Sequence, residues 1–116
     1  MTTSILFLIT GDPRKSPRPA EAIRIAAGVA ACKKSEVRVY LRDAAVLALS
    51  EYPDQFVDDE NYTRYLPMLS DLARPIYVQR GAHMLGELGQ PCQRFQEISD
   101  EELATLLAET TYLARF

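Results

Sequence analysis

Short apolar runs alternate with helical patterns along the chain. The first run, Ser4–Thr10, is continuously apolar, as is typical of a central parallel strand with both faces covered. Four more strands are predicted, at Val37–Leu41, at Ile76–Val78 after Pro75, at Cys92–Ile98 and at Tyr112–Phe116. Helical patterns lie at Ala20–Cys32, at Ala44–Leu49, between Tyr62 and Ala73, at Ala82–Leu88 and after Ser99. Strands that alternate with helices in this way predict an α/β fold around a mostly parallel sheet.

The helix predicted at Ala20–Cys32 is apolar on most of its faces. Only Glu21, Arg24 and Gly28 form a narrow polar line along it. One apolar face can pack on the sheet, so we expect the other to contact a second subunit. This helix is the main reason to predict a homo-oligomer.

Other local signals refine the predicted helices. Asp43 is expected to cap Ala44–Leu49, and Ser99 with Glu102 predicts a capping box. Pro67 must kink or restart the helix in which it falls. The aromatic residues around this region have two readings, packing over the end of the sheet or forming a subunit interface: Tyr52, Phe56, Tyr62 and Tyr65.

Composition bounds the class of protein. A chain of 116 residues predicts one domain, residues 1–116, and 47% hydrophobic with 25% charged residues is ordinary globular composition. The net charge of −3 gives no general affinity for nucleic acid or for an anionic membrane. The run Ile5–Ile9 is too short to cross a bilayer and lacks the features of a signal peptide, so we expect a cytoplasmic protein. Cys32 and Cys92 make neither a disulfide framework nor a zinc site, and no motif calls for a cofactor.

Polar residues follow three of the predicted strands. In an open α/β sheet, ligands bind beyond the carboxyl ends of the strands. The ligand-binding candidates are therefore Gly11, Asp12, Arg42, Gln79, Arg80 and His83. His83 is the only histidine and has the residue type of a general base, although a lone histidine is also compatible with a structural or exposed position.

A basic loop precedes the first predicted helix. Arg14, Lys15 and Arg18, with the free N–H groups of that helix, suit a small anion; the alternative is a solvated loop. The loop is neither a Walker motif nor a Gly-x-Gly-x-x-Gly turn, so it predicts no nucleotide. Spacing alone indicates no metal-ligand cluster and no catalytic triad.

The chain resembles the DsrE/DsrF-like family (YchN/TusD-type). Four segments carry the resemblance: Ile-Leu-Phe-Leu-Ile-Thr-Gly-Asp-Pro, Ala-Ile-Arg-Ile-Ala-Ala-Gly-Val-Ala-Ala, Val-Arg-Val-Tyr-Leu-Arg-Asp-Ala-Ala-Val-Leu and Pro-Ile-Tyr-Val. It implies a three-layer α/β/α sandwich with a parallel five-stranded sheet, flavodoxin-like in outline, in a dimer, trimer or hexamer. Several members of the family carry sulfur as a cysteine persulfide in relay pathways.

The cysteine of those sulfur carriers follows the strand that corresponds to Ile76–Val78, where this chain has Gln79. A glutamine forms no persulfide. Cys32 and Cys92 are the alternative thiols, but both are predicted near the amino ends of the strands, away from the expected pocket. The resemblance therefore implies a non-catalytic or weakly catalytic protein that binds a small ligand, an anion or a partner of sulfur metabolism. A persulfide carrier using Cys32 or Cys92 and a structural subunit of a hetero-oligomeric relay are the alternatives.

Overall fold

Five parallel strands form one sheet in the order β4-β3-β2-β1-β5 in the computed structural model, which describes residues 3–72, 76–91 and 93–116. The strands are β1 (Thr3–Ile9), β2 (Ser35–Leu41), β3 (Ile76–Gln79), β4 (Phe95–Ile98) and β5 (Tyr112–Arg115). The helices are α1 (Arg18–Ala31), α2 (Glu60–Leu72) and α3 (Asp100–Glu109). Three 3₁₀ helices lie in the connections: η1 (Asp43–Leu49), η2 (Pro53–Gln55) and η3 (His83–Glu87).

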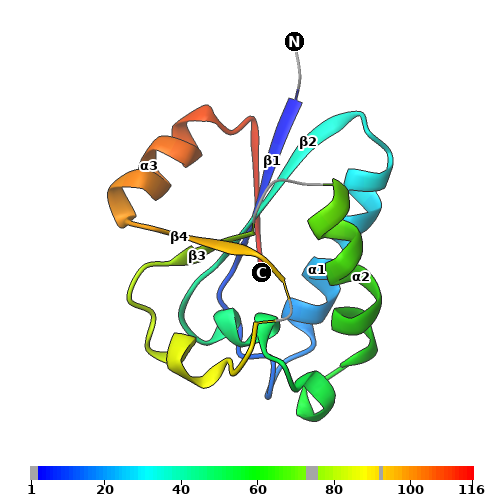
Figure 1. The fold of residues 1–116 in the computed structure, drawn as a ribbon. Coiled ribbons are helices and arrows are strands. Elements are labelled where there is room, and N and C mark those ends of the chain that lie inside the picture. The colour runs from blue at the N-terminus through cyan, green and yellow to red at the C-terminus, as the bar shows by residue number, and fades with distance from the viewer. Residues whose placement is uncertain (1–2, 73–75, 92) are drawn as a thin grey trace.

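Helices cover both faces of the sheet, so the fold is the predicted α/β/α sandwich. α1 and α2 lie together on one face and α3 lies on the other (Figure 1). The steps from β1 to β4 add strands in one direction, whereas the step from β4 to β5 runs back across the sheet. Because such crossovers are right-handed, the reversal places α3 on the face opposite α1 and α2.

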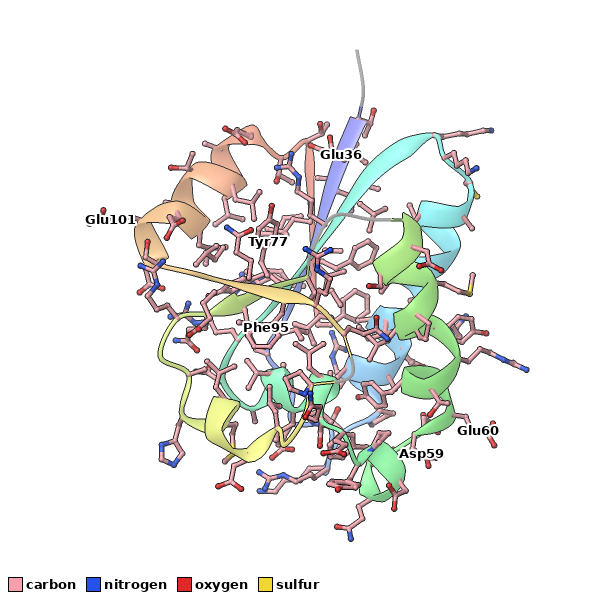
Figure 2. All side chains as sticks on the ribbon, in the orientation of Figure 1. Glu36, Asp59, Glu60, Tyr77, Phe95 and Glu101 are labelled. Carbon is pink, nitrogen blue, oxygen red and sulfur yellow. The ribbon has the colours of Figure 1, made fainter. Side chains whose placement is uncertain are left out.

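Two apolar layers follow from this arrangement. The larger layer joins the sheet to α1, α2 and η1, and its members include the half-buried Phe95 of β4. The smaller layer joins the sheet to α3 and includes Leu6, Tyr40 and the half-buried Tyr77. Figure 2 labels Tyr77 and Phe95 on the neighbouring strands β3 and β4. Alternation along each strand divides its side chains between the two layers.

The second apolar face of α1 is covered by the same chain, contrary to the subunit contact expected from the sequence. α2 packs alongside α1 (Figure 1). It supplies Tyr62, Leu66 and Leu69, which are at most 2% exposed and recur at helical spacing. The small residues of α1, such as Ala26, allow the two helices to approach closely. The apolar character of α1 therefore reflects a helix buried between the sheet and α2.

Local predictions met different outcomes. The capping box at α3 is confirmed: the Ser99 hydroxyl accepts from the Glu102 N–H at 3.1 Å, and the Glu102 carboxylate accepts from the Ser99 N–H at 3.1 Å. The cap predicted at Asp43 is wrong, because Arg42 holds the N-cap position and Asp43 itself has a left-handed φ of 55°. α2 continues through Pro67 without restarting. Pro75, Ala73 and Cys92 lie outside the described residues, and the strand predicted from Cys92 is described from Phe95.

Candidate functional site

A cleft of about 630 Å³ lies among the connections that follow β1, β2 and β3. These connections leave the carboxyl ends of parallel strands, the usual position for a ligand in an α/β sheet. The volume falls within the range of roughly 300–1,000 Å³ that is typical of small-molecule sites. The lining comes from the loop after β1, from η1, from residues 50–56 and from η3. The lining residues are Arg14, Leu47, Ser50, Tyr52, Asp54, Gln55, Phe56, Met84 and Glu87.

Arg14 is held in place by Asp12. The Asp12 carboxylate accepts from the Arg14 backbone N–H at 2.9 Å, from Nε at 3.0 Å and from one terminal nitrogen at 2.8 Å. The Arg14 side-chain hydrogen bond lowers the pKa of Asp12 below its usual value, and partial burial opposes this shift. The bidentate pair uses one edge of the guanidinium, so the other terminal nitrogen remains available at the cleft.

The entry to this loop is sterically fixed. A Cβ on Gly11 would lie 3.1 Å from Cγ of Pro19, so glycine suits the close approach between the loop and the start of α1. Farther along, the Pro13 carbonyl accepts from the Val57 N–H at 2.9 Å. This bond ties the loop after β1 to the segment that follows η2.

The segment from Ser50 to Phe56 forms another wall of the cleft. Ser50 is only 7% exposed, and its hydroxyl oxygen accepts from the Tyr52 N–H at 3.2 Å. The Phe56 ring packs edge-on against Tyr62, with ring centroids 5.6 Å apart. The Tyr52 ring is 68% exposed. This wall therefore combines anchored residues with one aromatic ring that is open to solvent.

Glu51 links the same segment to the residues after η3. Its backbone N–H donates to the Leu88 carbonyl at 3.1 Å, and its carboxylate accepts from the Gln90 N–H at 3.0 Å. Gly89 between them has a φ of 67°, and a Cβ there would lie 2.9 Å from the Glu51 carboxylate. The left-handed φ favours glycine here, and a larger residue would also displace the Glu51 carboxylate from the Gln90 N–H.

Three of the predicted site residues gather in a second cluster, at the ends of β2, β3 and β4. Arg42 donates to the Asp100 carboxylate at 3.0 Å and to the Tyr40 hydroxyl oxygen at 3.2 Å. Arg80 forms an ion pair with Glu102 at 3.0 Å. Both carboxylates belong to the first turn of α3, where negative charge complements the helix dipole.

Gln79 belongs to this second cluster and joins two strand ends. Its side-chain oxygen accepts from the Asp43 N–H at 2.9 Å. Asp43 is the residue with the left-handed φ, a conformation that costs energy for any residue with a Cβ. Gln79 therefore acts as a structural acceptor that stabilises the turn from β2 into η1.

The other described candidates, His83 and Cys32, lie outside both the cleft and the second cluster. His83 begins η3 and is exposed, and it does not line the cleft although Met84 does. Cys32 is exposed at the end of α1, just before β2, which is the amino end of the sheet as expected. Cys92 lies outside the described residues.

The basic loop does not converge on one site. Arg14 lines the cleft, whereas Arg18 lies over the Phe116 ring at 5.5 Å and donates to the Arg115 carbonyl at 3.4 Å. Asp54, Met84 and Glu87 were missed from the sequence, because each lies in a short irregular segment without periodicity or motif.

Two further findings concern the described part of the chain. Within residues 3–72, 76–91 and 93–116, no three His, Cys, Asp or Glu side chains are grouped as ligands for a metal ion. None of the helices described there has the length and apolar character needed to span a membrane.

No family model matches the sequence, and no curated protein matches it. Among solved structures, the crystal structure of the YchN protein from E. coli is similar, with a TM-score of 0.75 over 100% of both chains and 19% sequence identity. The five-stranded parallel sheet and its flanking helices are shared features of this comparison. The chain therefore has the fold of YchN, in agreement with the DsrE-like fold that its sequence predicts.

Proposed function

We propose that this protein is a non-catalytic binding protein that holds a small ligand in the cleft at the carboxyl end of its sheet. The observation that carries the proposal is the cleft itself, about 630 Å³ in volume, with Arg14 fixed at its wall by Asp12. Its described lining includes aromatic, aliphatic and charged side chains but no histidine or cysteine. Such a surface suits recognition by shape and charge.

A role in sulfur metabolism remains part of the proposal through the fold shared with YchN and the family resemblance of the sequence. The alternative of a persulfide carrier gains no support from Cys32, because that thiol lies at the amino end of the sheet. Incubation with a persulfide donor followed by intact-mass spectrometry separates the two functions. A sulfur adduct that disappears in Cys32→Ala or Cys92→Ala would favour the carrier.

Self-association is a further part of the proposal. β5 lies at one edge of the sheet, and its Tyr112 and Leu113 are 62% and 45% exposed. An unpaired strand edge with apolar side chains favours contact with another copy of the chain. Light scattering coupled to size-exclusion chromatography should give a mass above the 13.0 kDa of one chain, and Leu113→Lys should reduce it. A monomer at high protein concentration would remove this part of the proposal.

Filling the cleft tests the binding function. Met84 is half-buried at the cleft, so Met84→Trp should occupy part of its volume. Met68 is 37% exposed on α2 and does not line the cleft, which makes Met68→Trp the matched control. We expect fragments in a small-molecule screen by ¹H–¹⁵N NMR to shift the amides of Arg14, Tyr52 and Met84. These shifts should be lost in Met84→Trp and kept in Met68→Trp; binding that is equal in the two variants would contradict the proposal.

A further inference from the structure

Carboxylates outnumber cations around the cleft. Asp54 and Glu87 line it, and neither forms an ion pair with any residue of the described part of the chain. Arg14 is the only cation in the described lining; it is paired with the Asp12 carboxylate, and the charge of Glu87 also helps to raise the pKa of its guanidinium. Lys15 acts on Asp12 but does not line the cleft, and carboxylates remain in excess even when it is counted. The cleft therefore favours positive charge in a ligand.

Apolar and aromatic surface lies beside these carboxylates. Leu47 is 5% exposed, and Phe56 and Met84 are half-buried, so this part of the lining is partly shielded from water. The exposed Tyr52 ring offers a face for a cation, an interaction that strengthens with desolvation. A ligand that fits both features carries a positive charge on an apolar body.

A buried hydroxyl adds a polar contact. Ser50 lines the cleft at 7% exposure, and its oxygen is already the acceptor for the Tyr52 N–H. A hydroxyl oxygen has two lone pairs, so the second lone pair of Ser50 remains free to accept from an ammonium group. Such a bond would orient the ligand at the wall of the cleft.

The arginines near the carboxyl ends of the strands do not favour binding of an anion. Arg14 pairs with Asp12, Arg42 pairs with Asp100 and Arg80 pairs with Glu102, all within 3.0 Å. An anion would find one free terminal nitrogen at Arg14, beside the Asp12 carboxylate, and would compete with the paired carboxylates for Arg42 and Arg80. A cation can approach Asp54 and Glu87 without breaking any ion pair among the described residues.

We infer that the ligand of this cleft is a small organic cation, an ammonium group attached to an aromatic or aliphatic body. The inference rests on the proposed binding function and specifies its ligand class. Asp54 and Glu87 supply the charge, and Tyr52, Phe56 and Met84 contact the apolar body.

Three probes with the same phenyl body test this assignment: 2-phenylethylamine, 2-phenylethanol and 3-phenylpropionate. They are positive, neutral and negative at pH 7, and each is titrated into the ¹⁵N-labelled chain by NMR. We expect all three to shift the amides of the cleft and the amine to bind about fivefold more tightly than the alcohol, as partly exposed charge pairs permit. The carboxylate should bind more weakly than the alcohol.

Charge variants supply the control. The double variant Asp54→Asn with Glu87→Gln should abolish the preference for the amine. Glu101→Gln removes the same type of charge from α3, where Glu101 extends into solvent (Figure 2), and should leave the preference unchanged. Equal binding of the three probes, or tighter binding of the carboxylate, would overturn the cation assignment and leave the binding function in place. Failure of every probe to shift the cleft amides would overturn both.

Discussion

Tyr62→Phe removes a buried hydroxyl, and we expect this change to stabilise the protein. Tyr62 is 2% exposed, and its hydroxyl oxygen has no hydrogen-bond partner among the described residues. A buried polar group without a partner costs about 1–3 kcal/mol of desolvation. The small void left by the missing oxygen offsets part of that gain, so we expect a net stabilisation of about 1 kcal/mol. For a domain of this size the melting temperature should rise by about 4 °C.

Tyr40→Phe is the matched comparison, because Tyr40 is fully buried but its hydroxyl oxygen accepts from Arg42 at 3.2 Å. Loss of a hydrogen bond to a charged group should destabilise the protein by about 1.5–3 kcal/mol. Urea unfolding followed by circular dichroism measures both variants. The two free energies of unfolding should change in opposite directions. If both variants were destabilised by the same amount, the Tyr62 hydroxyl would have a partner and the reasoning would be wrong.

The same tyrosine gives a pH dependence. Burial, with added repulsion from Asp58 and Asp12, raises the pKa of Tyr62 above its ordinary 10.0. The unfolded chain then releases this proton at a lower pH than the folded chain. The contribution of the protonated Tyr62 to the free energy of unfolding is fully present below about pH 10. It decreases as the pH rises above that value. The alkaline loss of stability should therefore be smaller in Tyr62→Phe than in the wild type.

Three other substitutions test the fold around the site by urea unfolding. Ser99→Ala should cost about 1 kcal/mol through loss of the α3 cap, and Ser99→Asp should retain most of it; equal losses would contradict the capping role. Gln79→Ala should cost about 1 kcal/mol because the Asp43 N–H loses its acceptor, whereas Gln79→Glu keeps an acceptor and should stay near the wild type. Pro67→Ala should stabilise α2 by about 1–2 kcal/mol, since it restores a backbone donor inside the helix; a loss of stability would show that the proline is favourable there.

The elements of the fold were predictable because each leaves a local pattern. The continuous apolar run of β1 indicates a strand with helices on both faces, and Ser99 with Glu102 marks the start of α3 through side chains only three positions apart. Apolarity all around α1 was correctly read as burial. The segment that covers its second face, α2, was not predicted, because a periodic pattern shows that a face is covered without showing which segment covers it.

The cleft was less accessible to sequence reasoning. Asp12 was identified from its place after β1, but its pairing with Arg14 depends on a turn that the residue types do not specify. Glu87 and Asp54 come together only through the path of η2 and η3, short 3₁₀ helices without an apolar repeat. Gln79 was read as the site of a missing thiol, whereas its contact with the Asp43 N–H joins residues 36 positions apart.

The placement of β5 beside β1 has a consequence for biosynthesis. Ser4 bonds to Thr111 across 107 positions, and β1 lies between β2 and β5 in the sheet. During translation one edge of β1 therefore stays unpaired until residues 100–115 have left the ribosome. Such distant pairing slows folding and leaves a strand edge open to other nascent chains. Emergence of β5, rather than emergence of the first βαβ unit, is the step at which β1 gains its second neighbour in the sheet.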